Sequence, residues 1–123
     1  MDAKTLLDAG RYDASYYLAG YIVELGLKAC IARQTHAEEF PDKTRAERAW
    51  KHLPLDLVRA AGLERELNHR ISSNAEFAAR WAVAKDWQET SRYERHAEQE
   101  ARDIFDAVSQ EPNGVLAWIR RHW

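Results

Sequence analysis

The most apolar stretch of this chain, residues 12–33, carries four polar or charged side chains that a helix would bring to one face. Glu24 and Lys28 are the only charged residues in its interior, and their i,i+4 spacing with the acid first suits a helical ion pair. Tyr17 and Tyr21 precede Glu24 by seven and three residues, so both phenols lie on the same face as the carboxylate. The spacing therefore predicts a polar seam along an otherwise apolar helix.

This seam admits two interpretations. Removing either charge from water costs several kcal/mol unless a partner and further hydrogen bonds satisfy it. The first interpretation is a satisfied buried ion pair that fixes the register of the helix. The second is a polar groove in which Tyr17, Tyr21, Glu24 and Lys28 bind a ligand. The sequence leaves both open.

The helix that carries the seam is apolar on nearly every side, which predicts that it lies at the centre of the fold. Two charges in its interior, two glycines and four tyrosines argue against a bilayer span and favour a buried helix. Its apolar residues form two sets at helical spacing: Leu18, Ile22, Leu25, Ala29 and Ala32 on one side, and Tyr16, Val23, Leu27 and Ile31 on the other.

Shorter helices separated by turn signals are predicted for the rest of the chain. Gly10 ends a first helix over residues 2–9, and Gly62 ends a helix that begins near His52. Asn74 can cap the helix that follows it. Apolar spacing further predicts helical turns over residues 63–71, a last long helix that begins at the Ser91–Glu94 capping-box pattern and turns Ala97, Ala101, Ile104, Phe105 and Val108 inward, and a closing helix over residues 115–123.

No segment shows the alternation of a strand, so the predicted fold class is all-α. We expect an antiparallel up-and-down helical bundle of four to five main helices with short accessory helices. A length of 123 residues with 46% hydrophobic residues fits a single domain over residues 1–123. Five tryptophans and five tyrosines are many for this size, and they either fill the core or lie partly at a subunit interface.

Composition argues against several classes of function. A net charge of −2 argues against a protein that coats nucleic acid through its whole surface, although a local basic patch stays possible. Cys30 is the only cysteine and the histidines are scattered, so we expect neither a metal site nor an intrachain disulfide. A glycine-rich phosphate loop and a nucleophile elbow are also absent, and no cofactor is expected. The first residues lack a signal-peptide pattern, which favours the cytoplasm.

The order of several motifs resembles the HEPN domains of prokaryotes. The most specific of these motifs is the tyrosine-rich helix that ends in Glu24-x(3)-Lys28-Ala29. The others extend the resemblance over nearly the whole chain: Phe40-Pro41, His52-Leu-Pro-Leu-Asp-Leu57, Trp87-x(4)-Arg92-Tyr93 and Gly114-Val-Leu-Ala-Trp-Ile119. The resemblance implies a helical bundle, commonly dimeric, that binds a nucleotide or RNA. It also implies a minimal nucleotidyltransferase as partner in a toxin–antitoxin or defence module.

Many HEPN proteins are described as metal-independent ribonucleases that use an arginine and a histidine, separated by four to six residues, near the start of the last long helix. At the corresponding place this chain has Arg92 and His96, with three residues between them. On a helix that spacing still puts both side chains on one face, where a guanidinium could hold phosphate and an imidazole could move a proton. Arg92 and His96 are thus the candidate catalytic residues, and Arg92 and Tyr93 are candidate phosphate-binding residues.

His52 enters a short helix, where it either caps the helix or bonds to a carboxylate, or contributes to a ligand site. Arg45 and His52 have the family spacing, but they lie in an early loop. The sequence thus predicts a cytoplasmic protein that binds nucleotide or RNA phosphate, forms a homodimer and has a nucleotidyltransferase-type partner. A metal-independent ribonuclease and a pure protein-interaction module are the alternatives.

Overall fold

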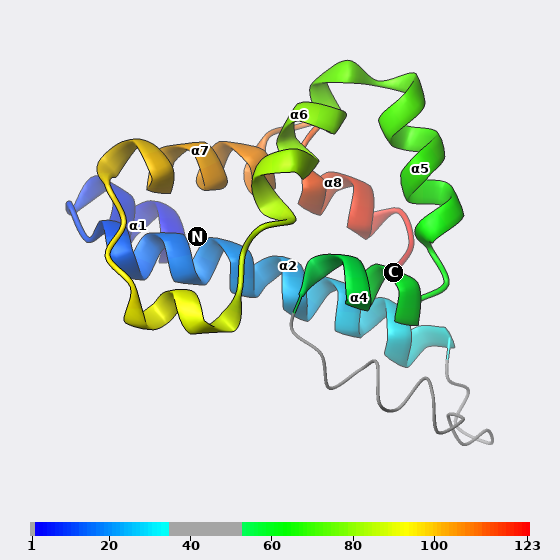
Figure 1. Ribbon diagram of the computed structural model, residues 1–123, viewed down its shortest axis with the longest axis horizontal. Helices are drawn as coiled ribbons and strands as arrows, with labels where there is room; N and C mark the ends of the chain where they lie inside the picture. The colour runs from blue at the N-terminus through cyan, green and yellow to red at the C-terminus, as the bar shows by residue number, and fades with distance from the viewer. Residues whose placement is uncertain (1, 35–52) are drawn as a thin grey trace.

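The computed structural model of the protein describes residues 2–34 and 53–123, apart from the side chains of Gln34, Arg92 and Tyr93 (Figure 1). His52 therefore lies outside the described residues. The described ranges hold no strand, which confirms the all-α fold class. The elements are α1 (Asp2–Asp8), α2 (Tyr12–Gln34), α4 (Pro54–Ala60), α5 (Glu64–Ser73), α6 (Ala75–Ala84), the 3₁₀ helix η1 (Glu89–Tyr93), α7 (Glu98–Ser109) and α8 (Val115–Arg120).

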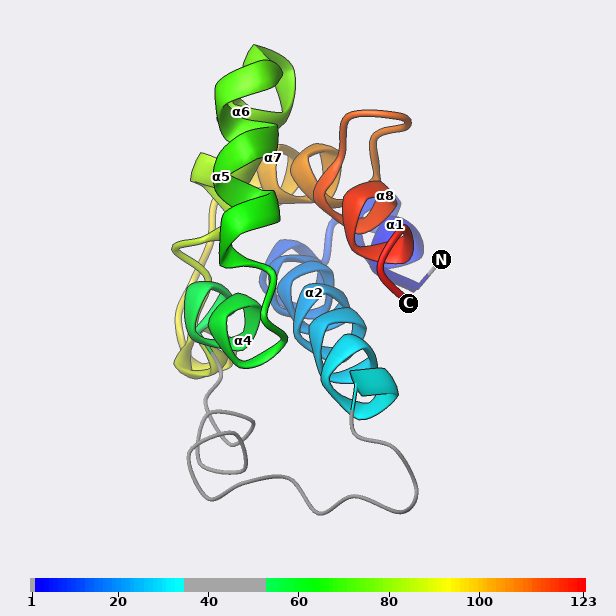
Figure 2. The same cartoon turned by 90° about the vertical axis from the view of Figure 1, so that its right-hand side faces the viewer.

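Helix α2 is the centre of the bundle, as its sequence predicts. It contacts α1, α4, α7, α8 and η1, and Figure 2, which looks towards one end of it, shows α4 on one side and α8 on the other. Its fully buried residues include Ala19, Val23, Leu27 and Cys30. Helix α5 rises away from α2, and α6 returns towards α2 before the chain passes through η1 to α7 (Figure 1).

The ends of the short helices follow the expected turn residues. Gly10 and Gly62 have φ angles of +77° and +71°, a left-handed conformation that other residues rarely adopt, and they stop α1 and α4. Pro54 is tolerated because it begins α4, where its missing N–H leaves no hydrogen bond unmade. The Asn74 side chain accepts a hydrogen bond of 3.0 Å from the backbone N–H of Phe77 and caps α6.

A close approach between α2 and the segment before η1 fixes the middle of the fold. The indole of Trp87 is fully buried and packs directly on Gly20. A Cβ atom on Gly20 would lie 2.1 Å from Cδ1 of Trp87, so only glycine leaves space for the ring. The chain between α6 and η1 is thereby pinned to the central helix.

The predicted start of the last long helix at Ser91 is wrong. Ser91 belongs to η1, where its Oγ donates to the Gln88 carbonyl and its own carbonyl accepts from the Glu94 N–H at 3.1 Å. These bonds close a 3₁₀ turn, and extended backbone at Glu94 and Ala97 then separates η1 from α7. Helix α7 begins at Glu98, and the expectation that Ala97 points inward is also wrong because Ala97 is exposed. Ala101, Ile104 and Val108 are buried as expected.

Candidate functional site

Glu24 and Lys28 form the i,i+4 ion pair that the sequence predicts. The Glu24 side chain is only 3% exposed, whereas that of Lys28 is 34% exposed, and Lys28 Nζ lies 3.8 Å from Glu24 Oε1. A carboxylate buried this deeply is costly unless it is compensated. The half-exposed ammonium brings a compensating charge to the edge of the core.

The two tyrosines of the predicted seam pack mainly against other rings. Tyr17 stacks on Tyr21 with a centroid distance of 5.8 Å and an interplanar angle of 15°, and it lies 5.8 Å from the ring of Trp87. Aromatic pairs at this distance stabilise a core beyond the area they bury. These contacts support the interpretation of the seam as a structural one, and ligand binding by Tyr17, Tyr21, Glu24 and Lys28 stays a prediction.

Arg92 and His96 do not share a helix, so the geometric premise for pairing them is wrong. Arg92 lies in η1, while His96 lies in the extended segment before α7. The spacing of three intervening residues therefore does not put them on one helical face. The side chains of Arg92 and Tyr93 lie outside the described residues, and their proposed contacts with phosphate stay predictions.

The imidazole of His96 is enclosed by protein atoms. Its side chain is 6% exposed, and its ring stacks on that of Tyr16 with a centroid distance of 3.7 Å and an interplanar angle of 9°. Nδ1 lies 3.2 Å from Glu100 Oε2, and Nε2 lies 3.4 Å from the Ser91 carbonyl oxygen. The hydrogen bond from His96 lowers the pKa of Glu100, and the backbone N–H of Ala97 lowers it further. With both nitrogens facing protein oxygens, this ring joins η1 to α7.

A groove of about 530 Å³ lies between α5 and the end of α8, away from the predicted residues. Helix α5 supplies one wall of the groove, and α8 with the residues after it supplies the other. The lining residues are Arg65, Glu66, His69, Arg70 and Ser73 from α5, and Trp118, Arg121 and His122 from the other side.

The groove is locally basic in a chain whose net charge is −2. Three arginines and one glutamate give its lining a charge of +2 with both histidines neutral. Burial lowers the pKa of His122; Glu66 acts in the opposite direction, and Arg121 lowers this pKa further. Acidification would therefore add positive charge to a surface that is already cationic.

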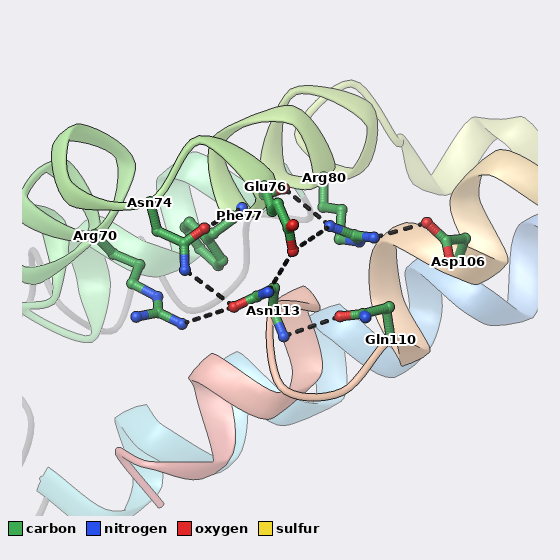
Figure 3. A network of polar contacts seen from close by, with 8 residues as sticks. All are labelled: Arg70, Asn74, Glu76, Phe77, Arg80, Asp106, Gln110 and Asn113. Atoms are coloured by element: carbon green, nitrogen blue, oxygen red, sulfur yellow. Dashed lines mark hydrogen bonds and ion pairs between the residues drawn. The ribbon is translucent and has the colours of Figure 1, made fainter.

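Arg70 is held in the groove wall by a network that joins α5, α6 and the turn before α8 (Figure 3). Its Nη2 donates to Asn113 Oδ1 at 3.5 Å, and its guanidinium carbon lies 5.7 Å from the centre of the Phe77 ring. Asn113 is in turn fixed by a hydrogen bond of 3.0 Å from the Asn74 side chain and by its own N–H, which donates to Gln110 at 2.9 Å.

Two features of Arg70 matter for binding. Its Nε atom is buried, and no hydrogen-bond partner for it lies among the described residues. Its guanidinium is nevertheless held in place, so it would lose little conformational entropy on binding an anion.

Trp118 forms the apolar floor of the groove and orients His122. Its indole is 3% exposed, packs on Phe77 with a centroid distance of 5.7 Å, and meets the His122 ring edge-on at 5.0 Å and 64°. The half-buried imidazole thus has one side fixed by tryptophan. The cations of α5 line the same groove.

Sequence reasoning missed this groove. Arg65, His69 and Ser73 recur at i,i+4 along α5, a spacing that puts three polar side chains on one face. The same segment also carries Leu63 and Leu67 at the spacing of a core helix, and this pattern predicts only that the opposite face is buried. The polar stripe on α5 was the available signal, but its partners Arg121 and His122 lie some 50 residues away in sequence and could not be assigned to it.

Comparisons of the chain with models of known protein families, with curated proteins and with solved structures give no match. No helix in residues 2–34 or 53–123 is long and apolar enough to cross a bilayer. Within the same ranges, no three or more His, Cys, Asp or Glu side chains come together as a set that could bind a metal ion.

Proposed function

We propose that this protein binds the phosphate groups of a nucleotide or of RNA in the groove between α5 and α8. The observation that carries the proposal is the convergence of three guanidinium groups and two imidazoles on one groove of a chain with net negative charge. A guanidinium group can donate two parallel hydrogen bonds to two oxygens of one phosphate. A volume of about 530 Å³ falls in the range of small-ligand sites.

The groove also offers a place for a nucleobase. The His122 ring is half-buried and braced by Trp118, and flat rings of this kind stack on bases without strong sequence preference. A nucleotide could therefore place its phosphate among Arg65, Arg70 and Arg121 and its base against His122. Single-stranded RNA presents the same combination of a charged backbone and open bases.

The biological setting of the proposal comes from the resemblance to HEPN domains. It consists of a cytoplasmic two-component toxin–antitoxin or defence module, a homodimer and a minimal nucleotidyltransferase as partner. Since the resemblance rests on motifs of the sequence alone, isolation of the protein from its native host with any bound partner is the direct measurement of that setting.

Labelled single-stranded RNA tests the groove. In a fluorescence anisotropy titration, the Arg65→Gln and Arg121→Gln variants should each bind several-fold more weakly than the unaltered protein, because each loses an exposed groove cation. The slope of log affinity against log salt should fall by about 0.7 for each lost phosphate contact. Competition with a mononucleotide and with inorganic phosphate shows which part of the RNA is recognised.

Arg102→Gln is the matched control for this titration. Arg102 is an exposed arginine on α7 that pairs with Glu98 at 2.9 Å, so the substitution makes the same change in net charge away from the groove. Equal weakening in all three variants would mean that the protein attracts RNA only through its overall charge. Unchanged affinity in the two groove variants would refute the proposal.

Metal-independent RNA cleavage is the second candidate, favoured by the two histidines that line the groove. His122 has a lowered pKa and could take the proton of a 2′-hydroxyl, while His69 could protonate the leaving oxygen and Arg70 could stabilise the charged phosphate. RNA incubated in chelator with the unaltered protein, the His122→Ala variant and the His96→Ala variant separates the two locations. Cleavage lost only with His96→Ala would return catalysis to the Arg92 and His96 region, and no cleavage would leave binding alone.

A further inference from the structure

The arginines that line the groove between α5 and α8 have no acidic partner in the described part of the chain. No Asp or Glu side chain there forms an ion pair with Arg65, Arg70 or Arg121. Arg59, on the neighbouring helix α4, shows the contrast, because its Nε lies 2.7 Å from Glu64 Oε2. The charges of the three groove arginines are therefore left for a ligand to neutralise.

The net charge of the lining matches the charge of a phosphate monoester. Three arginines and Glu66 give the lining a charge of +2 when both histidines are neutral. A phosphate monoester carries about −1.5 to −2 charges near pH 7, because its second pKa is about 6, whereas each internal phosphate of RNA carries one negative charge. A terminal phosphate therefore neutralises the groove, and an internal phosphate leaves about one positive charge unbalanced.

The placement of the three guanidinium groups also suits a terminal phosphate. Arg65 and Arg70 come from the α5 wall, and Arg121 comes from the opposite wall. Each guanidinium donates hydrogen bonds in a fixed fork, which binds best to two oxygens of one group. A terminal phosphate offers three free oxygens, so it can accept from both walls at once. An internal phosphate uses two of its four oxygens to join the chain and has fewer acceptors to share.

We propose that the groove recognises a phosphate monoester on ribose, either in a mononucleotide or at a phosphorylated end of an RNA strand, in preference to the internal phosphates of RNA. This inference rests on the proposed function, because it concerns the same groove. It narrows the ligand from phosphate groups in general to the phosphate at an end. The carrier of the preference is the lining charge of +2 together with three arginines that lack acidic partners among the described residues.

Fluorescence anisotropy with three forms of one internally labelled single-stranded RNA measures the preference. The forms carry a 5′-phosphate, a 3′-phosphate or hydroxyl groups at both ends. At least one phosphorylated form should bind about tenfold more tightly than the hydroxyl form, the factor expected for one further charge-assisted hydrogen bond. Unlabelled AMP and adenosine distinguish the two sources of the monoester. Displacement by AMP but not by adenosine assigns the site to a mononucleotide, and displacement by phosphorylated RNA alone assigns it to a strand end.

Arg121→Gln tests whether the groove causes the preference. Coulomb energy is proportional to the charge of the ligand, so loss of one cation costs a dianion about twice as much as a monoanion. The ratio of the affinities for phosphorylated and hydroxyl RNA should therefore fall several-fold in Arg121→Gln. Arg102→Gln is the matched control, because Arg102 pairs with Glu98 on α7 and the substitution should leave the ratio unchanged. Circular dichroism confirms that both variants are folded.

The outcomes separate this inference from the proposed function. Equal affinity for the three RNA forms, with weaker binding of all three by Arg121→Gln, would overturn the end preference and leave phosphate binding in the groove intact. A preference for phosphorylated RNA that Arg121→Gln and Arg65→Gln leave unchanged would place end recognition outside the groove and would overturn the inference as well. The absence of binding to every RNA form and to AMP would overturn both.

Discussion

The packing of Trp87 on Gly20 permits a quantitative prediction for Gly20→Ala. The new methyl group would lie 2.1 Å from Trp87 Cδ1, about 1.3 Å short of the ordinary contact distance of 3.4 Å. Trp87 is fully buried, so its ring cannot move into solvent without losing core contacts. Overpacking of this kind typically costs about 1–3 kcal/mol, and the severity of this overlap places it at the upper end.

Helix propensity acts against that cost. Alanine is favoured over glycine inside a helix by about 1 kcal/mol, so the expected net loss for Gly20→Ala is about 2 kcal/mol. Gly26→Ala makes the same change in the same helix, but its methyl group would lie 3.1 Å from Ile119 Cγ2, where a few tenths of an ångström of movement suffice. We therefore expect Gly26→Ala to be neutral or slightly stabilising.

Urea denaturation followed by circular dichroism measures the free energy of unfolding of both variants, and a thermal scan measures their midpoints. A loss of 2 kcal/mol should lower the thermal midpoint by several degrees, at about 2–8 °C per kcal/mol for small domains. The order of stability should be Gly26→Ala first or equal to the unaltered protein, with Gly20→Ala clearly last. If Gly20→Ala proves as stable as Gly26→Ala, the packing of Trp87 described above is incorrect.

Three further predictions concern the groove and its supports. The pKa of His122 is lowered in the folded protein, so its neutral form stabilises the fold above the ordinary pKa of 6.5. This contribution is lost as the pH falls through the lower pKa of the folded state. In unfolding titrations from pH 8 to 5, His122→Gln should therefore lose less stability than the unaltered protein. Asn74→Ala removes the cap of α6 and should cost about 1 kcal/mol in urea denaturation, whereas Ser72→Ala, at an exposed hydroxyl, should cost less than half of that. Asn113→Ala frees Arg70 from its acceptor and should weaken RNA binding in the anisotropy assay while Arg70 itself is retained, and unchanged binding would contradict the positioning role of Asn113.

Local chemistry made the helix ends predictable. Gly10, Gly62 and Asn74 act through backbone conformation or one side-chain hydrogen bond, and each stops or starts a helix where the sequence indicates. Ser91 failed because the same pattern of residues serves a 3₁₀ turn when its hydroxyl bonds to the Gln88 carbonyl instead of to a following N–H. Competition between such local bonds is decided by tertiary packing, here the burial of Trp87 just before η1.

The exposed side of α2 could not be predicted for a different reason. Both sides of this helix carry apolar residues at helical spacing, so periodicity does not indicate which side the rest of the chain covers. In the structure Val23 and Leu27 are buried, α2 contacts α4, α7 and α8, and Leu25 is 49% exposed. The groove is likewise a product of tertiary structure, since it brings α5 against the residues after α8.

The groove suits a phosphate better than the surroundings of His96 do. Each nitrogen of the His96 ring lies near a protein oxygen and the ring stacks on Tyr16, so a ligand would have to displace these contacts. Arg70 contacts Asn113 and Phe77, and its buried Nε has no acceptor among the described residues. A phosphate in the groove would offer acceptors to a guanidinium whose hydrogen bond to Asn113, at 3.5 Å, is a long one. Of the two side chains, Arg70 is therefore the one whose fixed charge has most to gain from a phosphate.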